Sequence, residues 1–223
     1  EGDIVLDFFA GSGSTGHAVL EQNAADGGNR KFILVQLPEP LPEPETRLQT
    51  IADITKERVS HVIKDLNDED AAKAPSLFDV DKPAQDRGFR VFKLAESNFK
   101  PWNADVPHDE KSLVQQLELH VDHIREGRTP DDILYEILLK DGYPLTTSVE
   151  TLQLAGKTVY GAAGGAFLIC LEYGLTMELI RAMAERKPDR VVCLDEGFAG
   201  NDQLKANAVQ LFKTKGVAKF KTV

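Results

Sequence analysis

The stretch "DFFAGSGSTGHAV", residues 7–19, joins an apolar run to a helix-like segment through a glycine-rich loop. The apolar run, residues 3–9, is rich in strand formers and predicts a strand that is buried on both faces. Ser14 or Thr15 is expected to cap the helix that follows. The next apolar run, residues 31–37, predicts a second buried strand. A strand, a helix and a strand within about 35 residues have the size of a right-handed parallel crossover.

Glycine-rich loops that follow a strand hold several kinds of ligand, and two of them fit poorly here. The phosphate-binding P-loop pattern fails because His17 and Ala18 stand where it requires Lys and then Ser or Thr. A dinucleotide site needs an acid at the end of the second strand to bind the ribose hydroxyls, and Gln36 stands there. A dinucleotide also brings two phosphates, which the carboxylate of Asp7 would repel.

S-adenosylmethionine fits the same loop better, because it has no phosphate and carries a positive sulfonium and a positive ammonium. Asp7 would attract these charges, and the helix N-terminus at Ser14 would favour the methionine carboxylate. Gln36 can pair with the ribose hydroxyls, while Phe8 or Phe9 can pack near the ligand. A tight turn with no ligand is the alternative, although three glycines cost stability of roughly 0.5 to 1 kcal/mol each.

The rest of the N-terminal half predicts a loop, a helix and a linker. Proline at every second position of residues 38–44 excludes both a helix and a sheet ladder, so this stretch is an extended loop. Apolar positions from Ile51 to Leu66 recur at helical spacing, which predicts an amphipathic helix that ends near Asn67 and covers one face of the sheet. An acidic, small-residue stretch then predicts a linker over residues 69–87.

Residues 88–223 alternate between strand-like and helix-like segments, which predicts a second, smaller α/β domain. Pro130 favours a helix start, because its fixed backbone angle suits the first helical position. Helices are expected at 112–127, 130–142, 175–188 and 201–216. Strands are expected at 88–95, on both sides of a glycine-rich turn within 158–172, at 189–197 and at 218–223.

Composition limits the function classes. The formal charge is −10, from 36 acids against 26 bases, so the chain by itself is not expected to present a large nucleic-acid surface. Cys170 and Cys193 both lie in apolar stretches and are interpreted as small buried residues of a reducing compartment. No apolar run reaches the ~18 residues of a membrane span, and the chain opens with Glu-Gly-Asp and no leader, so we expect a cytoplasmic protein.

Four other groups of residues have candidate functions, and a structural role is the favoured interpretation of each. The groups are a metal-binding histidine pair, a strand-end acid cluster, a base-stacking aromatic pair and a DNA-facing helix surface. Their members are His120 and His123 with Glu118; Asp195, Glu196 and Asp202; Trp102 with Phe99; and Lys56, Arg58 and Lys64. The strand-end acids precede a helix that Asn201 or Asp202 is expected to cap. No metal site is therefore predicted.

Four segments together resemble the C-terminal part of an adenine-specific DNA methyltransferase, most closely the modification (Mod) subunit of type III restriction-modification systems. They are "DIVLDFFAGSGSTGHAVL", "RKFILVQLPEP", "TIADITKERVSHVI" and "GFRVFKLAESNFKPWN". The resemblance runs from Glu1 to about Asn103, and "DILYEILLKDGYPL" and "VVCLDEGFAGNDQLKANAVQLF" extend it more loosely. It implies S-adenosylmethionine as the cofactor. The candidate cofactor-binding residues are Asp7, Phe8, Phe9, Ala10, Gly11, Ser12, Gly13, Ser14, Thr15 and Gln36.

The resemblance also implies different roles for the two parts of the chain. Residues 1–68 would be the C-terminal half of a partial Rossmann-like methyltransferase domain, and residues 88–223 a domain for dimerisation or for docking the restriction (Res) subunit. The family's catalytic signature is Asp or Asn, then Pro-Pro, then Tyr or Phe, which grips a flipped adenine. This chain contains no Pro-Pro pair. We therefore expect a fragment that has no catalytic residues and is inactive alone, with DNA contacted through missing N-terminal and target-recognition segments.

Two alternatives remain open. The chain could be an assembly module with an empty pocket, because an incomplete sheet exposes apolar edges that would pair with another segment or another protein. It could also be a fragment of a nicotinamide-dinucleotide-dependent oxidoreductase, which predicts binding of that cofactor. The parent protein is expected to be a homodimer.

Overall fold

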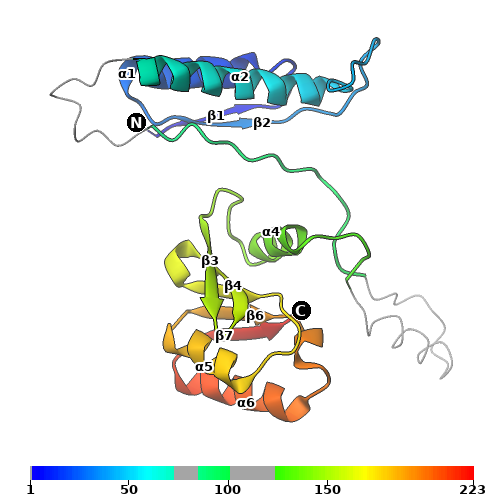
Figure 1. Ribbon diagram of the computed structural model, residues 1–223, viewed down its shortest axis with the longest axis vertical. Coiled ribbons are helices and arrows are strands. Elements are labelled where there is room, and N and C mark those ends of the chain that lie inside the picture. Colours follow the sequence, from blue (N-terminus) through cyan, green and yellow to red (C-terminus); the bar gives the residue numbers. More distant parts are fainter. Residues whose placement is uncertain (1, 73–84, 101–123) are drawn as a thin grey trace. The chain divides into compact units, whose positions relative to one another are not determined.

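The computed structural model describes residues 2–72, 85–100 and 124–223, and it shows a mixed α/β protein (Figure 1). The chain forms two compact units, Glu1–Lys93 and Leu94–Val223. None of the helices within the described ranges combines the length and the apolarity that a membrane crossing requires. The histidine pair, Glu118, Trp102 and most of the helix predicted at 112–127 lie outside the described residues.

The first unit contains the predicted crossover. Its elements are β1 (Ile4–Asp7), α1 (Ser14–Asp26), β2 (Lys31–Leu34) and α2 (Ile51–Ala72). The two strands pair in parallel, with Ile4 opposite Lys31 and Asp7 opposite Leu34. The proline-rich stretch forms no helix or strand and makes one isolated bridge, from Pro40 to Thr50. The predicted strand–helix–strand order and the extended loop are therefore confirmed.

The helix starts and ends in this unit differ from the predictions. The residue before α1 is Gly13, which adopts a left-handed conformation (φ 80°) and provides no side-chain cap, so capping by Ser14 or Thr15 is wrong. Thr50 precedes α2 and caps it, because its Oγ1 accepts a hydrogen bond from the amide of Asp53 at 3.2 Å. It runs beyond Asn67 to Ala72, because no glycine or proline stands between them to end it.

Among the described residues, helices cover one face of the β1–β2 sheet (Figure 1). Helices α1 and α2 pack on this face through a small core of Leu20, Val59 and Val62. Successive side chains of both strands point alternately towards the helices and towards the opposite face. On the opposite face Ile4 is 63% exposed and Ile33 is 46% exposed. The prediction that both strands are buried on both faces is therefore wrong for the described residues, because no described element covers the second face.

The second unit is built around a five-stranded sheet with the order β3-β4-β5-β6-β7. Strands β3 and β4 and strands β4 and β5 are antiparallel, whereas β5, β6 and β7 are parallel. The strands are β3 (Val149–Leu154), β4 (Lys157–Ala162), β5 (Phe167–Cys170), β6 (Arg190–Cys193) and β7 (Lys219–Thr222). The helices are α4 (Pro130–Lys140), α5 (Met177–Glu185) and α6 (Asp202–Thr214). A short helix at Ala163–Gly165 connects β4 to β5, and another at Glu196–Phe198 lies between β6 and α6.

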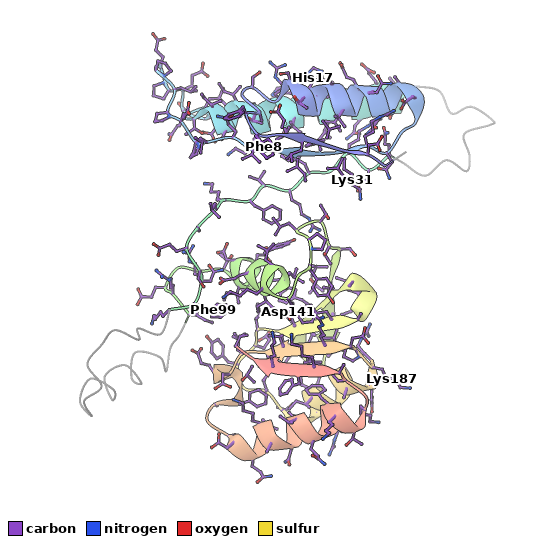
Figure 2. The ribbon with its side chains drawn as sticks, turned by 180° about the vertical axis from the view of Figure 1, so that it is seen from behind. Phe8, His17, Lys31, Phe99, Asp141 and Lys187 are labelled. Carbon is purple, nitrogen blue, oxygen red and sulfur yellow. The ribbon has the colours of Figure 1, made fainter. Side chains whose placement is uncertain are left out.

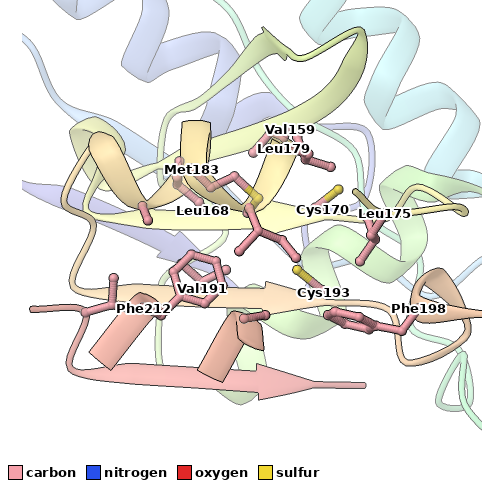
Figure 3. Close-up of a cluster of buried hydrophobic side chains, with 14 residues drawn as sticks. Val159, Leu168, Cys170, Leu175, Leu179, Met183, Val191, Cys193, Phe198 and Phe212 are labelled. Atoms are coloured by element: carbon pink, nitrogen blue, oxygen red, sulfur yellow. The ribbon is translucent and has the colours of Figure 1, made fainter. Parts of the chain in front are cut away.

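Helices cover both faces of this larger sheet. One face carries α5 and α6 over a core that includes Leu168, Met183 and Phe212 (Figure 3). The other face packs against α4, through residues such as Leu138 and Phe167. All four residues of β5 are buried, as a central strand between two helical layers requires.

The remaining predictions for this unit have mixed outcomes. The structure confirms the predicted helices α4, α5 and α6 and the predicted strands β4 to β7. It also confirms Asn201 as the cap of α6, because its side chain accepts a hydrogen bond from the amide of Leu204. The predicted strand at 88–95 is wrong: these residues form no regular element, because no described strand pairs with them. Strand β3 was not predicted. It lies at the sheet edge, is only half-buried, and carries polar residues that mask its alternation.

Cys170 and Cys193 are buried and carry free thiols, as the sequence predicts. They lie opposite each other on the neighbouring parallel strands β5 and β6. Burial raises the pKa of both thiols above their ordinary value, so they remain protonated at neutral pH. Their role in this structure is that of small core residues.

Candidate functional site

The candidate site lies at the carboxyl ends of β1 and β2, where a loop of residues 8–13 leads into α1. In open parallel sheets this edge is the one that binds ligands. Gly11 and Gly13 both have positive φ, of 52° and 80°, so the loop uses a conformation that favours glycine. The amide of Gly13 donates to the carbonyl of Ala10 at 2.7 Å, which makes the turn tight.

Asp7 is the charged group of the site. One carboxylate oxygen accepts a hydrogen bond from the hydroxyl of Thr15 at 2.5 Å, and the other accepts one from the amide of Phe9 at 3.0 Å. These two hydrogen bonds, that of Thr15 first, hold the pKa of Asp7 below its ordinary value of 3.8. The site therefore carries a fixed negative charge at neutral pH, oriented by the loop and by the first turn of α1.

Gln36 connects the loop to the end of β2. Its Oε1 accepts a hydrogen bond from the amide of Gly11 at 2.7 Å, and its Nε2 donates to the carbonyl of Leu37 at 3.1 Å. The carbonyl of Val35 accepts from the amide of Ala10 at 3.1 Å. The side-chain amide of Gln36, which the sequence predicts to pair with ribose, holds the glycine-rich loop in place in this structure.

Thr55 is a site residue that the sequence reasoning missed. Its hydroxyl donates to the carbonyl of Gly11 at 2.5 Å and also lies 3.1 Å from the carbonyl of Ile51. A Cβ on Gly13 would lie 3.1 Å from the Thr55 methyl group and 3.2 Å from its carbonyl oxygen, so α2 touches the loop closely. The one signal in the sequence is a polar residue at the same helical spacing as the buried Val59 and Val62.

The predicted site residues come together in this loop, but they differ in exposure. Ala10 and Gly13 are buried, whereas Phe8 and Phe9 are 64% and 89% exposed. Figure 2 shows Phe8 in the first unit. Ser14 is also exposed, at the first position of α1. The arrangement provides a fixed carboxylate, an open backbone turn and two exposed aromatic rings at one sheet edge.

No family model matches the chain, but comparisons with known proteins find relatives. The chain is 30% identical, over 218 residues, to the Mod subunit of the type III restriction-modification enzyme EcoP15I of Escherichia coli, which covers 92% of this chain. It is 40% identical, over 168 residues and 69% of this chain, to the StyLTI Mod subunit of Salmonella typhimurium. The chain is related to the Mod subunits of type III restriction-modification enzymes.

This Mod-related chain spans 29% of the length of the EcoP15I subunit and 26% of the StyLTI subunit, less than a third of each relative. Over a shorter range of 63 residues, the chain is 41% identical to the type II methyltransferase M.KpnI of Klebsiella pneumoniae. That match covers 26% of this chain and 15% of the methyltransferase.

Some members of the other candidate groups of this Mod-related chain make structural contacts where they are described, while Arg58 and Lys64 are exposed on α2. Asp195 forms an ion pair with Lys205, and no group of three or more potential metal ligands occurs among the described residues. Lys56 pairs with Asp53 at 2.7 Å on α2. The ring of Phe99 packs against the core beside α4 and lies 4.9 Å from the Lys140 ammonium.

Proposed function

We propose that the first unit binds S-adenosylmethionine and is the donor-binding portion of an adenine-specific DNA methyltransferase of the Mod type. The observation that carries this proposal is the ionised carboxylate of Asp7 at the ligand edge of a parallel sheet. A carboxylate there favours a cationic ligand and disfavours a pyrophosphate. S-adenosylmethionine, when bound, supplies an activated methyl group.

The residues around Asp7 fit such a ligand. A Cβ on Gly11 would meet only the carbonyl oxygen of Phe9, at 3.8 Å, so this face of the loop is open to a close approach. Phe8 and Phe9 offer exposed aromatic surface beside it. The ten residues of the proposed donor site are Asp7, Phe8, Phe9, Ala10, Gly11, Ser12, Gly13, Ser14, Thr15 and Gln36.

The whole-protein activity is part of the same proposal. The relatives are named as Mod subunits and as a methyltransferase, and this chain has no Pro-Pro pair with which to build the catalytic signature that its resemblance implies. We therefore propose that it transfers no methyl group by itself. In a complete protein it would act in the cytoplasm as a homodimer on DNA, together with a Res subunit and with further segments that contact adenine.

Calorimetric titration with S-adenosylmethionine tests the donor site. Wild-type chain should show saturable heat, and Asp7→Ala should weaken binding by at least about tenfold, equivalent to ~1.4 kcal/mol. Asp3→Ala, an exposed carboxylate at the other end of the same strand, is the matched control and should bind as the wild type does. Appreciable transfer from labelled donor to adenine-containing DNA would contradict the proposed inactivity of the chain alone.

An assembly role is the second candidate function, and the uncovered face of the β1–β2 sheet favours it. Ile4, Leu6, Ile33 and Val35 are all at least 46% exposed on this face. Contiguous apolar surface of this kind marks an interaction site in many proteins. Absence of heat with S-adenosylmethionine, alongside a dimer in light scattering, would support the assembly role over donor binding.

A further inference from the structure

Charge is distributed unevenly along this acidic chain. Its formal net charge is −10, yet residues 203–223 contain five lysines and neither Asp nor Glu. These residues form most of α6 and all of β7 in the second unit. The net charge therefore conceals a cationic region, and the fold determines where it lies.

The topology of the sheet brings two basic connections to one edge. Strands β6 and β7 are parallel neighbours, so the α5–β6 and α6–β7 connections both reach the sheet at its amino-terminal edge. The carbonyl of Asp189 accepts hydrogen bonds from the amides of Ala218 and Lys219, at 3.0 and 3.1 Å, which joins the two connections. Figure 2 shows Lys187 at this edge of the unit. The basic edge consists of Arg186, Lys187, Lys213 and Lys215.

All four side chains of the basic edge are exposed. Within the part of the chain that the structure describes, none of them forms an ion pair with a carboxylate. The neighbouring Arg190 and Lys219 differ, because both reach Asp141, at 3.5 and 3.1 Å. Two exposed acids, Glu185 and Asp189, lie in the same region, so cations exceed carboxylates at the edge.

Lys187 occupies a backbone conformation that favours glycine. Its φ is 51°, at the left-handed position that follows α5. The corresponding residues after α1 and α6 are Gly27 and Gly216, with φ of 68° and 86°. A non-glycine residue there is strained. Ala155, Ala163 and Ala199 have a similar φ, of 47° to 52°, so the conformation alone does not assign a function to Lys187, but it makes glycine a well-tolerated replacement there.

We propose that the basic edge binds the phosphate backbone of DNA. Long, exposed Lys and Arg side chains supply sequence-independent contacts to phosphates. A protein interface would be expected to have an apolar centre, but among the exposed large hydrophobic residues described in this unit Val209, one turn before Lys213 on α6, is the one beside the basic edge, and the others are Leu94, Leu139 and Tyr173. This surface lies in the second unit and does not depend on the donor site proposed for the first.

Fluorescence anisotropy with a labelled 30-base-pair duplex of arbitrary sequence tests the basic edge in the full chain, without S-adenosylmethionine. The triple variant K187E/K213E/K215E should bind at least about tenfold more weakly at low salt, and the slope of log K against log salt should become less steep by about 3. The matched control R58E/K64E/K93E changes the net charge equally at exposed positions of the first unit and should change affinity less than about threefold.

The single variant Lys187→Gly separates binding from capping. It should weaken duplex binding while leaving the melting temperature unchanged or raised, because glycine adopts the left-handed conformation without strain. A lower melting temperature with unchanged binding would overturn the proposal and make Lys187 a capping residue only. Two other results of the anisotropy experiment would overturn the proposal: equal losses of duplex affinity in the two triple variants, and no duplex binding by the wild type at low salt. The proposal would also fail if K187E/K213E/K215E lost self-association, measured by light scattering, but kept its affinity for the duplex.

Discussion

The two units contain similar apolar strands but bury them differently. In the first unit, Ile4 and Leu6 of β1 point away from the helices and are 63% and 47% exposed. In the second unit, every residue of β5 is buried between two helical layers. An apolar run therefore predicts that a segment is a strand, whereas its burial depends on what the rest of the fold places on each face.

This difference in burial also distinguishes the features of the two units that bear on their roles. The second unit has a core on both faces of its sheet, and so it has the features of a self-sufficient fold. The first unit places a charged loop at the ligand edge of a sheet that has one uncovered apolar face. We therefore propose donor binding for the first unit, and the face that no described element covers is where an additional element or partner would pack.

Matched leucine substitutions test this contrast with the largest expected effect. Leu168→Ala, in β5, removes a fully buried side chain and should lower the free energy of unfolding by about 2 to 5 kcal/mol. Leu6→Ala, on the uncovered face of β1, should lower it by less than about 1 kcal/mol. Urea denaturation measures both. Equal losses would show that the face of β1 is covered in solution.

The ion cluster of Asp141 with Lys219 and Lys221 in the second unit should give a pH-dependent effect of intermediate size. Burial raises the pKa of Asp141, but hydrogen bonds from Lys219 and Lys221 outweigh this and lower it below the ordinary value of 3.8. A lowered folded-state pKa means that the carboxylate stabilises the fold above pH ~4 and that this stabilisation is lost as pH falls through the folded-state pKa.

Asp141→Asn should therefore cost about 2 kcal/mol at pH 7, and the difference from wild type should shrink as the pH falls below ~4. Urea denaturation at several pH values measures this change. Asp65→Asn, at an exposed position of α2, is the control and should show little difference at either pH. A penalty for Asp141→Asn that does not vary with pH would contradict the assigned ion cluster.

The smallest expected effect concerns the contact between α2 and the glycine-rich loop. Thr55→Val keeps the shape of the side chain but removes the hydroxyl that donates to Gly11, and it should lower the stability of the first unit by about 1 kcal/mol. Hydrogen exchange at the amides of the loop should rise at the same time. Thr55→Ser keeps the hydroxyl and is the control. Equal exchange in the two variants would show that the hydroxyl does not hold the loop.

Local sequence patterns predicted most of the elements because each pattern has a local cause. The apolar runs gave β1, β2, β5, β6 and β7, and Pro130 marked the start of α4. The same reasoning failed where the cause is not local. Residues 88–95 have the composition of a strand but pair with no described strand, and β3 is a polar edge strand that its hairpin with β4 stabilises.

The candidate site was also predictable only in part. The glycines, Asp7 and Gln36 are close in sequence to the two strand ends, so the parallel crossover brings them to one edge. Thr55 comes from a helix 44 residues after Gly11, and no spacing rule connects them. The cap of α1 was mispredicted because the left-handed turn at Gly13, and not a side chain, begins the helix.

The charge of Asp7 is the central claim for the site, and one calorimetric experiment tests it most directly. Asp7→Asn keeps the size of the side chain and removes the charge, so it should weaken S-adenosylmethionine binding by at least about tenfold. The wild-type chain should show no saturable heat with a nicotinamide dinucleotide. Saturable dinucleotide binding by the wild type, or unchanged S-adenosylmethionine binding by Asp7→Asn, would contradict the account.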